Sequence, residues 1–148
     1  MPLGIRPKSD FIYTASWQQL HVITEHWQSD LAFYGDEIRF MQNLISKYFL
    51  LLVKEESAED LQKLVSRLMD IDKNQESLKD QTLKHLGHIA DAVKNSLSDG
   101  EHRFRDEHAH LEDGFVKFVT DFRALKKDVF KVTEHMLQGE KLRHLLGK

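Results

Sequence analysis

The sequence has no cysteine among its 148 residues, which excludes disulfides, thiolate zinc sites, iron–sulfur clusters and cysteine nucleophiles. Any bound metal must therefore be held by histidine and carboxylate side chains. Long apolar runs are also missing, since the longest, YFLLLV at 48–53, is far too short to span a bilayer. The first residues lack the apolar core of a signal peptide. We therefore expect a cytoplasmic protein with no membrane partner.

Neither sign of charge is in large excess. The net charge is −3, and acidic and basic residues are interspersed, so no basic stripe is available to follow phosphate groups. We expect no nucleic-acid partner. Glycine is scarce as well, and no glycine-rich phosphate loop or nucleophile elbow is present. The sequence therefore favours a protein that is not an enzyme.

Proline occurs only at positions 2 and 7, so nothing after residue 7 forbids a helix on proline grounds. Apolar residues recur at alternating steps of three and four, which is the heptad pattern of packed helices. This pattern predicts helices at about 15–54, 58–97 and 101–138. Ser16 and Gln19 have the spacing of a capping box at the start of the first helix. The seam of heptad positions runs from Trp17 to Leu52, from Leu61 to Ser96, and from Phe104 to Met136.

Three long helices joined by very short turns must run up, down and up. The predicted fold is therefore all-α: an elongated antiparallel three-helix bundle, coiled-coil-like, forming one domain over 1–148. An N-terminal arm at 1–14 precedes it, and a short helical tail at 140–148 follows Gly139. The alternative is a compact four- or five-helix bundle, formed by a break at Gly35 or at DKNQES, 72–77.

Histidine is abundant, with nine residues. The short turns place His21 level with His108, Glu25 level with His88 and Glu112, and His85 toward Phe115. Each helix thereby offers a pair at i, i+3 or i, i+4 spacing, which puts both side chains on one face. Helical bundles that present His and Glu inward bind zinc or iron. The candidate ligands are His85, His88, His108, His21, Glu25 and Glu112.

A structural interpretation competes with the metal site. Histidines in a helical core can hydrogen-bond a carboxylate across a polar layer and fix the register of the helices. The segment EHAH also places Glu107 and His110 at the Glu-x-x-His spacing of helical di-iron sites. However, His110 falls at an outward heptad position and no second Glu-x-x-His exists. The four-helix di-iron ligand set is therefore not matched.

A second apolar stripe lies on the first helix, away from its heptad seam. Its members are Phe33, Phe40, Leu44 and Leu51. Such residues need a partner, which could be the N-terminal arm, the tail or a second copy of the chain. The sequence therefore predicts a non-enzymatic binding or scaffolding protein that self-associates, as a homodimer, or binds a protein partner. The alternative function is divalent-metal binding, with zinc or iron as the cofactor.

Overall fold

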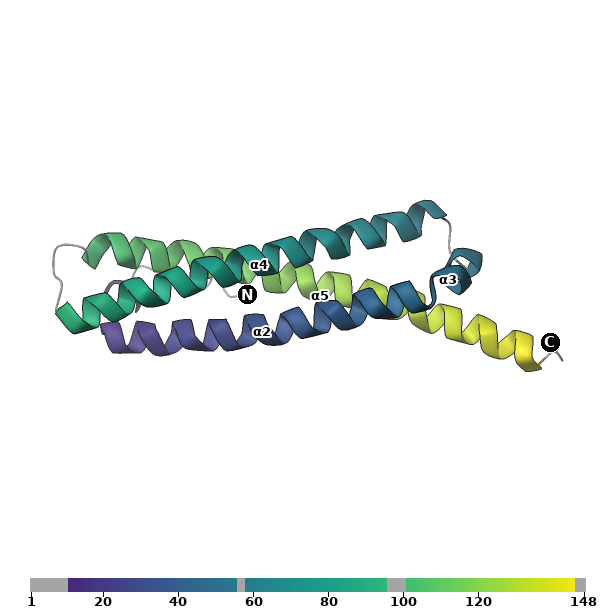
Figure 1. Ribbon diagram of the computed structural model, residues 1–148, viewed down its shortest axis with the longest axis horizontal. Helices are drawn as coiled ribbons and strands as arrows, with labels where there is room; N and C mark the ends of the chain where they lie inside the picture. The colour runs from purple at the N-terminus through teal and green to yellow at the C-terminus, as the bar shows by residue number, and fades with distance from the viewer. Residues whose placement is uncertain (1–10, 56–57, 96–100, 146–148) are drawn as a thin grey trace. The chain divides into compact units, whose positions relative to one another are not determined.

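The computed structural model describes residues 11–55, 58–95 and 101–145. These residues form helices α2 (Trp17–Lys47), α3 (Phe49–Glu55), α4 (Ala58–Asn95) and α5 (Glu101–Leu145), with no strand among them (Figure 1). The predicted all-helical class is confirmed. No helix within these ranges combines the length and the apolar character needed to cross a membrane. Residues 56–57 of the turn predicted near 54–57, the turn predicted at 98–100, residues 1–10 of the arm and 146–148 of the tail lie outside the described residues.

The heptad seams form the buried sides of the helices. Every described seam residue is buried or half-buried, including polar members such as Thr24, Gln75 and Thr82. The start of α2 carries the predicted capping box. The Gln19 backbone N–H donates to Ser16 Oγ at 3.1 Å, and the Ser16 N–H donates to Gln19 Oε1 at 2.8 Å. These two bonds satisfy donors that a helix terminus would otherwise leave unpaired.

The helix boundaries differ from the predictions at two places. The first helix ends at Lys47, and the chain changes direction at Tyr48 before α3 begins (Figure 1). At the other end of the chain, α5 continues through Gly139 to Leu145, so this part of the predicted tail belongs to α5. The breaks considered at Gly35 and at 72–77 do not occur, because α2 and α4 run through them.

The chain divides into two compact units. The first consists of Met1–Tyr34 and Asn74–Val119, and the second of Gly35–Lys73 and Thr120–Lys148. In the first unit, Arg105 of α5 ties residues 11–15 to the helices, since its guanidinium donates to the carbonyl oxygens of Ile12 at 2.5 Å and Ala15 at 2.8 Å. The same guanidinium lies over the ring of Trp17.

In the second unit, two ion pairs link the helices at the surface. Lys126 Nζ lies 2.6 Å from Glu37 Oε1, and Arg67 Nη1 lies 2.7 Å from Asp128 Oδ2. These pairs connect α5 to α2 and to α4. All four side chains are partly exposed, so each pair contributes at most about 1 kcal/mol, and the apolar seam supplies most of the stabilisation.

Candidate metal centre

Helices α4 and α5 bring together a cluster of three histidines and one carboxylate in the first unit. His85 and His88 lie one turn apart on α4, so both project toward α5. Glu107 Oε1 lies 2.5 Å from His85 Nδ1 and 2.8 Å from His88 Nδ1. On the other edge of the His85 ring, Nε2 lies 2.9 Å from His108 Nδ1. One carboxylate oxygen is therefore the meeting point of two imidazoles.

The hydrogen bonds define the tautomers of the cluster. An ionised carboxylate only accepts, so His85 and His88 must each donate from Nδ1–H to Glu107. The Nε2 atom of neutral His85 is then an acceptor, and His108 Nδ1–H donates to it. No buried side-chain nitrogen or oxygen of the described residues lacks a hydrogen-bond partner. The buried polar atoms of the cluster are thus all hydrogen-bonded without a metal ion.

Burial controls the protonation of the two core histidines. Desolvation lowers the pKa of His85, and the hydrogen bond to Glu107 only partly opposes this effect. Desolvation, together with the charges of His85 and Arg105, lowers the pKa of His108 to about 3. Burial would raise the pKa of Glu107, but the hydrogen bonds from His88 and His85 outweigh it, so this pKa lies below its usual value. At neutral pH, His85 and His108 are neutral and Glu107 is ionised.

Aromatic rings enclose the cluster on two sides. Trp27 of α2 stacks on His108 with ring centroids 4.6 Å apart, and Phe104 stacks on His88 at 4.9 Å. His85 and His108 are almost completely buried, whereas the side chains of His88 and Glu107 are 41% and 35% exposed. The cluster therefore has a rigid, dry inner side and an outer side that solvent can reach.

Three residues of the cluster lie close enough together to hold a metal ion. The ligand atoms of His85, His88 and Glu107 all lie within 4.8 Å of one another. In a tetrahedral zinc site, bonds of about 2.0–2.1 Å place neighbouring ligand atoms about 3.3 Å apart. The two contacts to Glu107 would therefore lengthen by less than 1 Å as an ion replaced the two shared protons.

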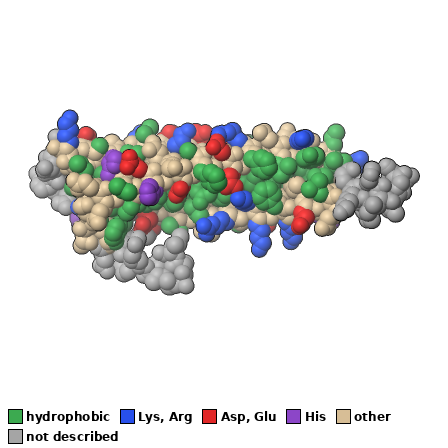
Figure 2. All heavy atoms as spheres, turned by 90° about the horizontal axis from the view of Figure 1, so that it is seen from below, with side chains coloured by type: hydrophobic (Ala, Val, Ile, Leu, Met, Phe, Trp, Pro, Cys, Tyr) green, Lys and Arg blue, Asp and Glu red, His purple; other side chains and the backbone are tan. Residues whose placement is uncertain are grey.

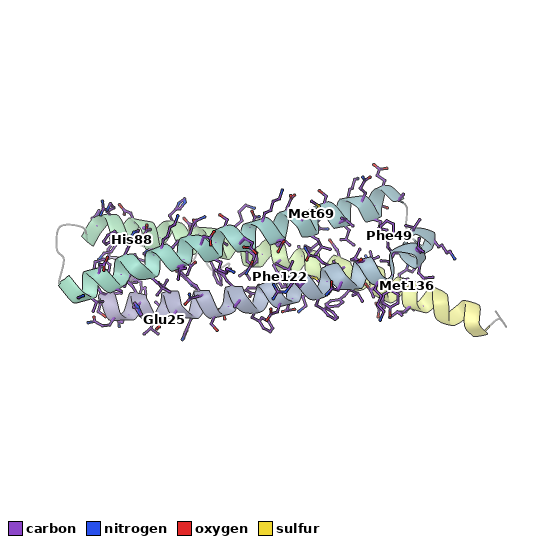
Figure 3. All side chains as sticks on the ribbon, viewed as in Figure 1. Glu25, Phe49, Met69, His88, Phe122 and Met136 are labelled. Carbon is purple, nitrogen blue, oxygen red and sulfur yellow. The ribbon has the colours of Figure 1, made fainter. Side chains whose placement is uncertain are left out.

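The other predicted ligands lie outside this group of three. His21 is paired with Glu25 on α2, with Nδ1 and Oε1 3.5 Å apart. Figure 3 shows Glu25 on the outer side of α2, away from His88, and its side chain is largely exposed. Glu112 is half-buried on α5. His108 belongs to the cluster, but it lies on the edge of the His85 ring opposite Glu107. Of the six predicted ligands, His85 and His88 belong to the group.

Glu107 belongs to the cluster, although it was not among the predicted metal ligands. The alignment of helices placed His85 toward Phe115, whereas His85 contacts His108, seven residues earlier on α5. On the side of α2, the Gln75 amide donates to the carbonyl of Leu31 at 2.8 Å. Relative to α5, helix α4 is thus displaced by about one heptad from its predicted place. Because of this displacement, Glu107 lies beside His88 in place of the predicted Glu112.

Comparison with known proteins adds no assignment. No protein-family model, curated protein or solved structure matches the chain. The chemistry of the cluster must therefore be argued from its own geometry.

The predicted apolar stripe is only partly exposed. Phe33 and Phe40 of α2 are 60% and 56% exposed, while Leu44 of α2 is half-buried. Leu51 is also half-buried, and it lies on α3 and not on the first helix as predicted. Figure 2, which views the molecule from below, shows several places where hydrophobic side chains reach the surface. The largest apolar residues exposed among those described are Val22, Phe33, Phe40, Phe49, Leu50, Val53, Met69, Leu83, Val93, Phe130 and Leu137.

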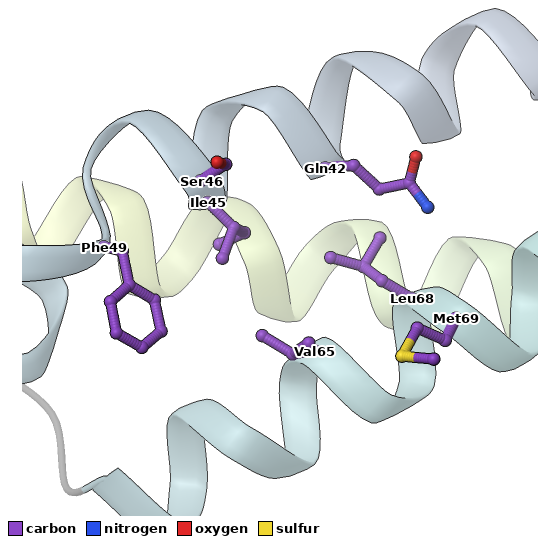
Figure 4. A pocket seen from close by; sticks show the side chains of 7 residues that line it. All are labelled: Gln42, Ile45, Ser46, Phe49, Val65, Leu68 and Met69. Carbon is purple, nitrogen blue, oxygen red and sulfur yellow. The ribbon is translucent and has the colours of Figure 1, made fainter.

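A separate apolar pocket lies in the second unit. Its volume is about 490 Å³, and Figure 4 shows Phe49 and Ile45 on one side of it and Val65, Leu68 and Met69 of α4 on the other. Phe49 and Met69 are both exposed at its rim. Only Gln42 and Ser46 add polar groups to the lining, so the pocket has no charged group to recognise an ion.

Proposed function

We propose that the chain binds a divalent metal ion, zinc above all, through His85 Nδ1, His88 Nδ1 and Glu107. The observation that carries this proposal is that two imidazole nitrogens from α4 converge on one carboxylate oxygen from α5. A polar layer needs only one hydrogen bond per group, whereas a metal site needs several ligand atoms around one point. The three atoms meet that second requirement.

The protonation and exposure of the ligands support the same proposal. Metal ligands must offer lone pairs, so histidine must be neutral and glutamate ionised. Burial keeps His85 neutral by lowering its pKa, and the two imidazoles lower the pKa of Glu107. The partly exposed side chains of His88 and Glu107 give an ion a route from solvent. Two histidines and one carboxylate suit zinc, and ferrous iron accepts the same set.

A melting experiment tests this proposal. Protein purified without a tag and treated with a chelator is melted with and without added zinc. If zinc binds only the folded state, unfolding becomes harder by about 2.7 kcal/mol at a hundredfold excess over the dissociation constant. We expect Glu107→Gln and His88→Ala to lose this stabilisation. His110→Ala, which removes an exposed histidine of α5, is the matched control and should keep it.

Identical melting curves of the wild type without metal, with zinc and with ferrous iron would overturn the metal site. The cluster would then be a polar layer that fixes the register of α4 against α5. Ferrous iron, added without oxygen in a parallel melt, separates the two metals. A larger stabilisation by iron than by zinc would reassign the ion but keep the ligands.

We also propose that the chain self-associates through α2, with a second copy covering Phe33 and Phe40. Support comes from their exposure, since large aromatic side chains that remain more than half exposed favour a partner surface. Leu44 and Leu51 are half-buried and would contribute only the edges of such an interface. A symmetric pair of α2 helices is the simplest arrangement that covers both phenylalanines.

Light scattering on Phe40→Asp tests the self-association. We expect a wild-type dimer that the charge converts to a monomer, because an aspartate at the interface would be buried without a partner. Ser66→Asp adds the same charge at an exposed position of α4, away from the stripe, and is the matched control. A wild type that stays monomeric at high concentration would contradict the proposal.

We further propose that α4 and α5 run antiparallel in the first unit, as a three-helix bundle requires. The contacts that support this pair His85 with His108 and His88 with Phe104, while a side chain added at Gly114 would meet Leu78. Residue numbers therefore rise along α4 as they fall along α5. By contrast, Trp27 and Tyr34 of α2 contact His108 and Phe118 of α5 in the same order along both helices.

A further inference from the structure

His108 occupies a position that the three-ligand site does not itself explain. Its Nδ1 atom lies 2.9 Å from Nε2 of His85, on the edge of the ring opposite Glu107. If His85 binds a metal through Nδ1, His108 cannot reach the same ion. His108 is also almost completely buried and packed against the Trp27 ring, so its place beside His85 is fixed.

A metal-bound histidine carries its remaining proton on the other ring nitrogen. That N–H almost always donates to a nearby acceptor, which fixes the orientation of the ring. For His85 the remaining nitrogen is Nε2, and the partner at hydrogen-bond distance is His108 Nδ1. Because His85 is completely buried, its Nε2–H has no water to turn to if His108 is removed.

We propose that His108 is a positioning residue for the metal site, accepting a hydrogen bond from Nε2–H of metal-bound His85. The inference rests on the proposed metal-binding function. It implies that metal binding reverses the hydrogen bond between the two rings. Without metal, His108 Nδ1–H donates to His85 Nε2. With metal, His85 Nε2–H donates to His108 Nδ1.

The proton balance of this reversal is closed. The metal displaces the proton on His85 Nδ1, which passes to solvent as the nitrogen–metal bond forms. The proton on His108 Nδ1 moves along the existing hydrogen bond to His85 Nε2. His108 Nε2 then takes up a proton from solvent. One proton leaves and one enters, both rings stay neutral, and no group is oxidised or reduced.

Two substitutions of similar size separate positioning from packing. His108→Leu fills the space without an acceptor, whereas His108→Gln keeps a carbonyl oxygen that can accept from His85. Loss of such an outer partner typically weakens metal binding about 10–100-fold. In zinc titrations against a competing chelator, we expect that loss in His108→Leu and recovery of most of the affinity in His108→Gln. Zinc binding by His108→Leu as tight as in the wild type would overturn the inference.

A measurement on the wild type avoids any dependence on the folding of the variants. Long-range ¹H–¹⁵N spectra show which ring nitrogen carries the proton. We expect the proton of His85 on Nδ1 without metal and on Nε2 with zinc, with a matching exchange at His108. A proton that stays on His108 Nδ1 in the zinc-bound protein would overturn the inference.

Failure of this inference is distinct from failure of the proposed function. If the wild type binds zinc and Glu107→Gln does not, the three-ligand site stands, whatever the His108 variants do. An unchanged affinity in His108→Leu then removes only the positioning role. If the wild type binds no zinc at all, the site and the role of His108 fall together.

Discussion

His108 shows how strongly a helical core can perturb one side chain. Its ring is almost completely buried, stacked on Trp27 and in contact with His85, and its pKa is lowered to about 3. Desolvation is the largest cause, followed by the charges of His85 and Arg105. A histidine held neutral in this way makes the stability of the fold depend on pH.

We expect the metal-free protein to lose stability as the pH falls below about 6.5, the ordinary pKa of histidine. Between that value and the folded-state pKa of about 3, the unfolded chain binds a proton at His108 that the folded chain does not. The free energy of unfolding should therefore fall by about 1.4 kcal/mol per pH unit from this residue alone. Urea unfolding at a series of pH values, with chelator present, measures the slope.

The variants identify the source of that slope. His108→Leu should make the dependence of the free energy of unfolding on pH shallower by the contribution of His108. His110→Gln, which changes an exposed histidine, should leave this dependence unchanged. His85 and Glu107 contribute in the same direction, because the pKa of each is also lowered on folding. A slope that is the same in the wild type and in His108→Leu would contradict the pKa assigned to His108.

The sequence identified individual residues of the cluster well where the heptad pattern applied. His85 and His108 fall on seam positions, and the structure buries both. Glu107 was missed because it lies at the border of the seam, where burial depends on which residue of the neighbouring helix stands opposite. That information is not contained in the periodicity of one helix.

Helix α4 contains a glycine, Gly87, that lies neither in a turn nor against another helix. Gly87 is exposed, and a Cβ added there would meet nothing within 4 Å. At Gly114 of α5, an added Cβ would lie 3.2 Å from Cδ2 of Leu78, which is closer than comfortable contact. The two glycines therefore have different roles although both are helical. Gly114 allows α5 to approach α4.

We expect Gly87→Ala to stabilise the protein by about 1 kcal/mol, the usual difference between alanine and glycine inside a helix. Gly114→Ala should gain less, because the Leu78 side chain must move to accept the new methyl group. Urea unfolding of both variants measures the difference. A larger gain at Gly114 than at Gly87 would show that the α4–α5 contact is looser than the structure has it.

Helix positions along the chain were predictable, whereas the register between helices was not. A shift of α4 by seven residues restores the same heptad seam, so the apolar pattern is equally satisfied in both registers. Specific contacts decide between them, such as the bond from Gln75 to the Leu31 carbonyl and the bonds of His85. The change of direction at Tyr48 was also missed, because the seam continues through Leu52 without a proline or glycine.

For the whole molecule, the all-helical class followed from sequence because the absence of proline and the unbroken heptads leave few alternatives. The division into two units did not, because helices α2, α4 and α5 each contribute residues to both. The elongated bundle predicted from the short turns remains a prediction about shape. It concerns how the two units are arranged.

Small-angle scattering tests that shape. A compact chain of this length has a radius of gyration of about 15 Å. We expect a clearly larger value for the protein at low concentration, because long helices joined by short turns extend the mass along one axis. Phe40→Asp, measured in parallel, removes any contribution from self-association. A radius close to the compact value in both proteins would contradict the elongated bundle.

If His85, His88 and Glu107 hold one divalent ion, the folded protein should retain metal in a fixed ratio to the chain. Elemental analysis tests it most directly, using untagged protein that is equilibrated with zinc and then separated from unbound metal. We expect one zinc ion per chain in the wild type and in the control His110→Ala, and none in Glu107→Gln. Substoichiometric zinc in the wild type, or a full complement in Glu107→Gln, would contradict it.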